Sequence, residues 1–283
     1  MPVNISSISK IMEDLKQIED KIDLLTKKVN DLYLNPTLER QYSLPSYHDL
    51  SESEKLSILQ EISNVAENNF LQIEALLSIY NSLPNMKFVP TTRGWAGSPD
   101  FLNKIVEIIL KQKPHFVCEA SSGVSTVVIG LALKMNNLGK ALSLEHDSFY
   151  AEKSRNNIII NEIEDFSIIM NCPLNDCLIG KTIWKWYDIH ELTFTDKIDL
   201  LIIDGPPRIT QNLARFPAIP LLYKYFSDNV IIILDDANRP DEIIIVEKWI
   251  DFLEKEGCKI NIEKYPHYEK GLVVMEITKN KPF

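Results

Sequence analysis

The stretch from His115 to Asp147 constrains the fold most strongly, because strand, tight turn, helix and strand signals follow one another without a break. An apolar run ends on Glu119, a loop of small residues leads through Gly123, and Ser125 stands at the start of an apolar helix. A second apolar run ends on Glu145. This order is typical of the first βαβ unit of a doubly wound sheet, whose ligands bind beyond the carboxyl ends of the strands.

The acid at the end of the second strand indicates the class of ligand. A carboxylate at this position, Glu145, can accept hydrogen bonds from both hydroxyls of a ribose. The loop contains a single glycine, Gly123, while Ser121 and Thr126 stand where a pyrophosphate-binding fingerprint has its other glycines. The pattern therefore favours a ribosylated cofactor without a pyrophosphate, such as S-adenosylmethionine, and leaves a nicotinamide dehydrogenase as the less favoured alternative.

The rest of the chain continues the alternation of strands and helices. Helices are predicted near 98–113, 150–161, 209–226 and 241–256, strands near 166–170, 198–203, 229–234, 259–264 and 271–278, and a less regular span at 171–195. The last two strands have no helix between them, which predicts an antiparallel pair. The predicted class is α/β: a Rossmann-like, doubly wound, mostly parallel sheet with an antiparallel C-terminal edge hairpin, preceded by an N-terminal coiled coil and a helix.

The N-terminal segment has a heptad pattern. Apolar residues recur at alternating spacings of three and four, at Ile8, Ile11, Leu15, Ile18, Ile22, Leu25, Val29 and Leu32. This seam predicts a coiled coil over residues 1–34 and self-association through it. Ile and Leu are mixed at both seam positions, so the oligomer number stays open. The alternative is an intramolecular helical hairpin with the next helix.

Residues 35–84 are predicted to be a linker followed by a second long helix. Asp49 or Ser51 serves as its N-cap, acids follow in the first turn, and the helix runs to about Leu83. Its apolar stripe consists of Leu56, Leu59, Ile62, Ala66, Phe70, Ile73, Leu77 and Tyr80. We expect this stripe to pack against the first helix or a symmetry mate. The remaining residues, 85–283, form the cofactor-binding domain.

Composition excludes several classes of partner. The net charge of −10 is unfavourable for binding nucleic acid, which requires a basic surface. No stretch reaches the roughly 18 uninterrupted apolar residues of a membrane span, and the N-terminus lacks the apolar core of a signal peptide. The four cysteines are scattered without metal-ligand spacing, as in reduced proteins. We therefore expect a cytoplasmic protein without a transmembrane segment.

Residues from about 93 to 278 resemble the class I S-adenosylmethionine-dependent methyltransferases. The resemblance rests on ASSGVST, LSLEHD, WKWYD, LLIIDGPP, ARFPAIPLL and ILDDANRPDE, in that order. More narrowly, these blocks resemble a bacterial subgroup, similar to methyltransferase domain 24, in which many members are associated with the modification of sugars and surface glycans. The family usually has glycine where this chain has Ser121. If that position has a positive φ, serine costs on the order of 1 kcal/mol.

The resemblance implies roles for the residues at the strand ends. Glu119, Ser121 and Gly123, with Ser125 beside them, would surround the methionine part, and Glu145 would hold the ribose. Cys172 would border the adenine. His146 would stack near the adenine, unless it is a structural surface histidine. This assignment predicts S-adenosylmethionine as the cofactor.

Three acids at adjacent strand ends form a candidate site for a hard cation. Asp204 follows the fourth strand, and Asp235 and Asp236 follow the fifth. Their oxygens suit Mg²⁺ or Mn²⁺, which would acidify a bound hydroxyl, and metal-dependent O-methyltransferases of this fold resemble the arrangement. Asp204 or Asp236 would serve as the catalytic base. The alternative is structural, because Asp204 begins a DGPP turn and Asp236 can cap the following helix.

Arginines and aromatic residues near the predicted ligand edge suggest an acceptor site. Arg208, Arg215 and Arg239 would grip an anionic or sugar acceptor, or else lie solvated at the surface, and the aromatic residues of WKWY at 184–187 would stack on it or pack internally. The expected function is O-methylation of a sugar or glycan hydroxyl, either with or without the aid of a divalent metal. The alternatives are O-methylation of a phenolic or other natural-product hydroxyl, and a coiled-coil scaffold with a degenerate cofactor domain.

Overall fold

A computed structural model describes residues 51–280 except 89, 93, 95 and 191–195. The chain divides into two compact units, residues 1–64 and 65–283. The predicted coiled coil at 1–34 lies outside the described residues, and so does the linker up to residue 50. None of the described helices is both long enough and apolar enough to cross a membrane.

Helix α3 (Glu52–Ser82) is the second long helix that the sequence predicts. Ser51 is its N-cap, because Ser51 Oγ accepts a hydrogen bond from the Glu54 amide at 3.3 Å and Glu54 Oε2 accepts one from the Ser51 amide at 2.8 Å. Further along the helix, Gln72 and Asp100 exchange two hydrogen bonds of 2.7 and 3.1 Å that attach it to α4 (Pro99–Gln112).

The predicted apolar stripe of α3 is exposed. Its exposed members, each between 49% and 69% accessible, are Leu56, Leu59, Ile62, Phe70, Ile73, Leu77 and Tyr80. The residues of α3 that are buried, Gln72, Ala75 and Ile79, lie on another face. The first helix, one of the two partners predicted for the stripe, lies outside the described residues, so the packing of the stripe on that helix or on a symmetry mate stays a prediction.

The sheet has seven strands in the order β3-β2-β1-β6-β7-β9-β8. Its strands are β1 (Phe116–Ala120), β2 (Lys140–Glu145), β3 (Ser167–Asn171), β6 (Ile198–Ile203), β7 (Phe226–Asp235), β8 (Lys259–Tyr265) and β9 (Leu272–Thr278). Only β9 runs antiparallel to its two neighbours. The predicted mostly parallel sheet and its antiparallel edge hairpin are confirmed.

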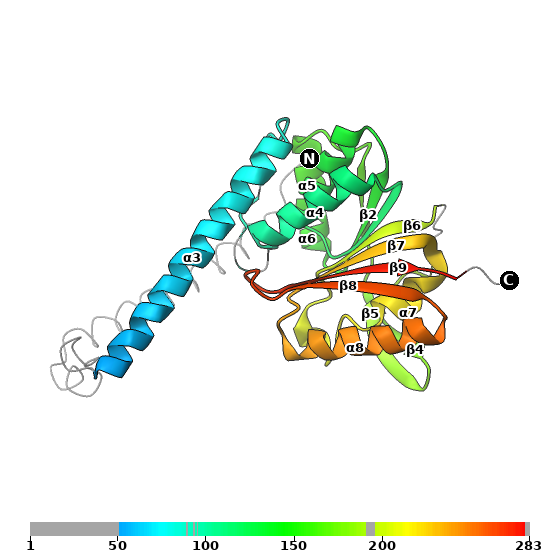
Figure 1. The fold of residues 1–283 in the computed structure, drawn as a ribbon. Helices are drawn as coiled ribbons and strands as arrows, with labels where there is room; N and C mark the ends of the chain where they lie inside the picture. The colour runs from blue at the N-terminus through cyan, green and yellow to red at the C-terminus, as the bar shows by residue number, and fades with distance from the viewer. Residues whose placement is uncertain (1–50, 89, 93, 95, 191–195, 281–283) are drawn as a thin grey trace, which may run out of the picture. The chain divides into compact units, whose positions relative to one another are not determined.

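Helices cover both faces of this sheet (Figure 1). On one side lie α4, α5 (Val124–Asn136) and α6 (Ser148–Ile160), and on the other α7 (Ala218–Leu222) and α8 (Pro240–Lys255). The apolar core accordingly forms two clusters, one on each face. The chain order reverses between β1 and β6, which puts the carboxyl ends of β1 and β6 side by side at the topological switch point.

Two local predictions were wrong. The segment 209–226 is not one helix: short 3₁₀ turns at Arg208–Thr210 and Tyr223–Tyr225 flank the five-residue α7. Pro217, the N-cap of α7, explains the break before this helix, because proline disfavours helical geometry at the residue before it and lacks an N–H to donate. Pro220 lies inside the first turn of α7, where proline is tolerated. The span 171–195, expected to be irregular, contains an antiparallel hairpin of β4 (Leu174–Ile179) and β5 (Thr182–Tyr187).

Candidate functional site

The loop after β1 has the backbone geometry expected of a ligand-binding turn. Ser121 has a φ of 144° and Gly123 a φ of 147°, in a region that only glycine adopts without strain. The Gly123 amide donates to Thr126 Oγ1 at 3.1 Å, which holds the loop against the first turn of α5. The positive φ that would make a serine unfavourable at position 121 is therefore present.

Glu119, at the end of β1, is fully buried. Its carboxylate accepts hydrogen bonds from the hydroxyls of Ser125, Thr126 and Ser143. Burial raises the pKa of Glu119 to about 7, although the three hydroxyls act in the opposite direction. Because the Glu119 carboxylate is bonded to hydroxyls of α5 and β2, it holds the loop between β1 and α5 in place and does not belong to the described lining of the cavity.

Glu145 ends β2 and is 5% exposed. Its Oε1 accepts a hydrogen bond from the Asp147 amide at 3.0 Å, and its Oε2 accepts one from Ser122 Oγ at 2.8 Å. Burial opposes ionisation, but the contacts with His146, the Asp147 amide and Ser122 together outweigh it and lower the pKa of Glu145. The group is therefore a carboxylate at neutral pH, as a ribose-binding acceptor requires.

His146 lies beside this carboxylate. Its Nδ1 is 3.0 Å from Glu145 Oε1, without the angle of a hydrogen bond, so the contact is an ion pair when the imidazole is protonated. The proximity of Glu145 raises the pKa of His146 above its ordinary value. Its ring lies edge-on to Tyr187, with 6.1 Å between the ring centroids.

A cavity of about 530 Å³ lies over these strand ends. Residues from the loop, from β2 and from β6 line it together, among them Ser121, Gly123, Ser125, Glu145, His146 and Asp204. Glu119 and Cys172, also predicted to contact the cofactor, are buried and are not among the lining residues that the structure describes. The Cys172 amide instead donates to the Glu145 carbonyl at 2.6 Å, which fixes the end of β2.

Tyr187 forms part of the wall of this cavity. A Cβ atom at position 205 would lie 2.3 Å from the Tyr187 hydroxyl, so the turn after β6 requires glycine there. The other two aromatic residues of the predicted stacking group pack internally: Trp186 is buried in the second core cluster, and the Trp184 ring lies 4.8 Å from that of Phe216. Only Tyr187 of the three is therefore placed to contact a ligand in this cavity.

A larger hollow of about 850 Å³ lies at the opposite, amino ends of the parallel strands, beside His115, Lys197 and Asp199. Asp199 is engaged there, because its Oδ2 accepts from the His115 and Phe116 amides at 2.8 and 3.3 Å. Ligands of doubly wound sheets bind at the carboxyl ends. We therefore place the candidate site in the smaller cavity.

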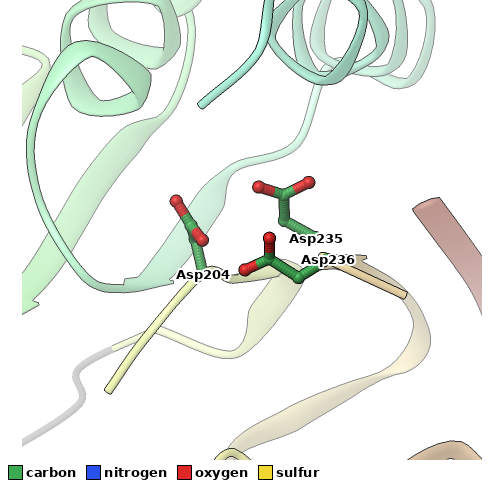
Figure 2. A group of neighbouring side chains, drawn as sticks. All are labelled: Asp204, Asp235 and Asp236. Atoms are coloured by element: carbon green, nitrogen blue, oxygen red, sulfur yellow. The ribbon is translucent and has the colours of Figure 1, made fainter. Parts of the chain in front are cut away.

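The three predicted acids meet at the ends of β6 and β7 (Figure 2). Each of Asp204, Asp235 and Asp236 offers one carboxylate oxygen, and these oxygens lie within 4.8 Å of one another. Burial raises the pKa of Asp204 to about 6 against the pull of Arg215, and it raises the pKa of Asp235 well above its ordinary value. Asp204 lines the cavity, whereas Asp235 and Asp236 are buried and do not belong to its lining.

Arg215, predicted at the mouth of the pocket, is instead buried among these acids. It is 3% exposed, and its Nη2 donates to Asp236 Oδ2 at 2.6 Å and to Asp204 Oδ1 at 3.1 Å. Arg239 reaches the other oxygen of Asp236 at 2.8 Å, while Arg208 is exposed. Three acids at one edge of the sheet require a cation nearby if they are buried, so the sequence indicated that such a partner exists. It did not show which arginine this is.

Solved structures with the same fold include O-methyltransferases. A putative O-methyltransferase from Klebsiella pneumoniae is 16% identical, with a TM-score of 0.52. An O-methyltransferase from Bacillus cereus in complex with SAH (S-adenosylhomocysteine) is 12% identical, with a TM-score of 0.51. Each alignment covers 76% of this chain and 97% of the other. No protein-family profile and no curated protein sequence matches this chain. At these identities the likeness establishes the fold alone.

Proposed function

We propose that this chain is an S-adenosylmethionine-dependent O-methyltransferase. One observation carries the proposal: the ionised Glu145 at the end of β2 lines the same cavity as the Ser121–Gly123 turn and the strand-end acid Asp204. Such a reaction needs three parts: a carboxylate that binds the ribose, a loop that allows a ligand to approach closely, and a general base. The shared fold of the O-methyltransferases named above supports the same activity.

In this proposal the cofactor supplies the methyl group on a sulfonium, and the chain supplies alignment and proton removal. Glu145 would orient the cofactor through its ribose, with Ser121 and Gly123 along the methionine part. Asp204 would accept the proton of the attacking hydroxyl, because it alone of the three acids lines the cavity. Its pKa of about 6 leaves it largely ionised at neutral pH and basic enough to take a proton.

For the acceptor we propose a sugar or glycan hydroxyl, on the strength of the sequence blocks that resemble glycan-modifying methyltransferases. One observation favours the alternative, a phenolic or other natural-product hydroxyl: Ile209 lines the cavity beside Pro207 and is 90% exposed, so the rim beyond Asp204 is apolar. Transfer of labelled methyl groups to matched panels of sugars and phenols separates the two.

Assistance by Mg²⁺ or Mn²⁺ fits the donor set poorly. Both oxygens of Asp236 and one oxygen of Asp204 already contact guanidinium groups at 2.6–3.1 Å. A divalent cation would have to displace Arg215 to bind all three acids. We therefore assign no step of the reaction to a metal.

The proposal is tested by calorimetric titration of the full chain with S-adenosylhomocysteine, in buffer that contains a chelator. We expect saturable binding by the wild type and at least about tenfold weaker binding by Glu145→Ala, because hydrogen bonds to a charged group contribute about 1.5–3 kcal/mol each. Glu152→Ala is the matched control: this acid, on α6, has a side chain that is 66% exposed and lies outside the cavity. It should bind like the wild type.

Two outcomes would contradict the proposal. If the wild type does not bind at millimolar ligand, the cavity is not a site for this cofactor, and the alternative of a coiled-coil scaffold becomes the better one. If Glu145→Ala binds as tightly as Glu152→Ala while its circular dichroism remains native, the carboxylate has no role in holding the ribose.

A further inference from the structure

We propose that Arg215 holds the place in the strand-end acid cluster that a divalent cation would take, so that the cluster works without a metal ion. The proposal concerns Asp204, Asp235, Asp236 and the guanidinium between them. It goes beyond the methyltransferase activity proposed above and does not depend on which cofactor the cavity binds.

The guanidinium group of Arg215 links the carboxyl ends of two neighbouring strands. Its Nη2 donates to the Asp204 carbonyl at 2.8 Å and lies within 3.1 Å of carboxylate oxygens of both Asp204 and Asp236. Its Nη1 donates to the Asp235 carbonyl at 2.8 Å, and its Nε is 3.8 Å from Glu242 Oε1. A positive charge with directed contacts to all three residues thus lies where a bound ion would draw the acids together.

The remaining donors do not make a good site for a small dication. Mg²⁺ requires near-octahedral oxygen ligands at short range and usually retains several waters. Arg215 occupies Asp236 Oδ2 and Asp204 Oδ1, and Arg239 lies 2.8 Å from Asp236 Oδ1. To admit the ion, Arg215 would have to withdraw from a position where its side chain is 4% exposed. The buried carbonyl of Asp235 and the partly buried carbonyl of Asp204 would then lose the donor that Arg215 supplies.

Two carboxylate oxygens of the cluster favour the opposite interpretation. Asp235 Oδ2 and Asp236 Oδ1 are buried and accept no hydrogen bond from the described residues, although Arg239 Nη2 lies 2.8 Å from Asp236 Oδ1. Among the described residues only Asp236 Oδ1 of these two has a guanidinium beside it, so the free oxygen of the cluster is Asp235 Oδ2, and one such oxygen does not make a cation site. Neither Asp235 nor Asp236 lines the cavity, so an ion held by these two would not face a ligand there. The free oxygen nevertheless identifies Asp235 as the residue through which a metal would have to bind.

The arrangement makes Arg215 a positioning residue for Asp204. It binds both the carbonyl and the carboxylate of Asp204, the acid that lines the cavity, and through Asp235 and Asp236 it ties that residue to the next strand. Arg215 thereby fixes the direction of the carboxylate with respect to the cavity, a task that metal-dependent sites give to the ion.

The test is binding of Mn²⁺ to the full chain after removal of metals with a chelator. Free Mn²⁺ is followed by electron paramagnetic resonance, and thermal unfolding is recorded with millimolar Mg²⁺ and with chelator. We expect no bound Mn²⁺ and the same melting temperature under both conditions. An ion present at a hundredfold excess over its Kd would raise the melting temperature by about 5–10 °C.

Two variants distinguish replacement of a cation from ordinary packing. Arg215→Met removes the guanidinium and should allow Mn²⁺ to bind to the acids, whereas Arg239→Met, at a side chain that is 39% exposed, should not. Binding gained in the first variant should disappear when Asp235→Asn is added. A merely structural arginine would change stability without changing affinity for the ion.

Stoichiometric Mn²⁺ binding by the wild type that is lost in Asp235→Asn would overturn the proposal. So would a folded Arg215→Met variant that takes up no Mn²⁺, because the guanidinium would then not be what excludes the ion. If Arg215→Met does not fold, the wild-type titration alone decides the matter. Since the metal test uses no cofactor, its result is independent of the titration with S-adenosylhomocysteine.

Discussion

Replacement of Ser121 by glycine is expected to stabilise the protein, because the φ of 144° at this position lies in a region that residues with a side chain rarely adopt. The position lies in the turn between β1 and α5, where the backbone borders the candidate cofactor cavity. The substitution leaves the carboxylates of the site in place and changes only the conformational cost of the turn.

The magnitude follows from two opposing contributions. Backbone strain of this kind costs on the order of 1–3 kcal/mol, which glycine relieves. Glycine also makes the unfolded chain more flexible, which costs about 0.4–1 kcal/mol. The net gain is about 1 kcal/mol, and for a domain of this size it raises the melting temperature by about 2–4 °C.

Thermal unfolding measured by circular dichroism checks this, with Ser122→Gly as the control. Ser122 is next in the chain and has no positive φ, and its hydroxyl donates to Glu145 at 2.8 Å and contacts Ser154 Oγ at 2.9 Å. Glycine at position 122 therefore relieves no strain and removes hydrogen bonds, so its melting temperature should fall. If both variants lose stability equally, the strain attributed to Ser121 is absent.

Three further outcomes are expected. The wild type should lose stability, on the order of 3 kcal/mol at most, as pH rises from about 4.5 to 7, because the raised pKa of Glu119 means that only the folded state keeps the proton in this range. Glu119→Gln has no such proton and should not show this loss. Urea unfolding at several pH values measures the free energy of unfolding of both proteins. Asp147→Ala removes the N-cap of α6 and should cost about 1 kcal/mol, seen as a lower melting temperature. Leu15→Asn with Ile22→Asn should reduce the mass in light scattering to that of one 32.5 kDa chain; an unchanged mass would exclude the coiled coil as the assembly element.

The sequence was sufficient for the parts of the site that lie at the ends of apolar strands. Each such strand is a short apolar run, and the first polar residue after it lies at the edge of the sheet, which is how Glu145, Asp204 and Asp235 could be placed together from the sequence alone. The same rule was less informative for Glu119. It is the last polar residue of β1, one position before the strand ends, but its carboxylate is bonded inward to the hydroxyls of Ser125, Thr126 and Ser143. These contacts depend on how α5 packs on β2.

Arg215 shows why the remainder of the site could not be predicted. On the continuous helix expected over 209–226, an arginine would be expected on the solvent-exposed face, because arginine side chains are mostly exposed. That helix is broken before Ala218, where Pro217 is the N-cap of α7, and the preceding residues form turns, with Leu213 at a φ of 53°. The turns direct Arg215 between strand ends that are 11 and 20 or more residues away along the chain. Pro217 could be read from the sequence, but it does not say which arginine becomes buried. That depends on the path of the chain through the turns, where the guanidinium of Arg215 reaches carbonyl and carboxylate oxygens that need a donor.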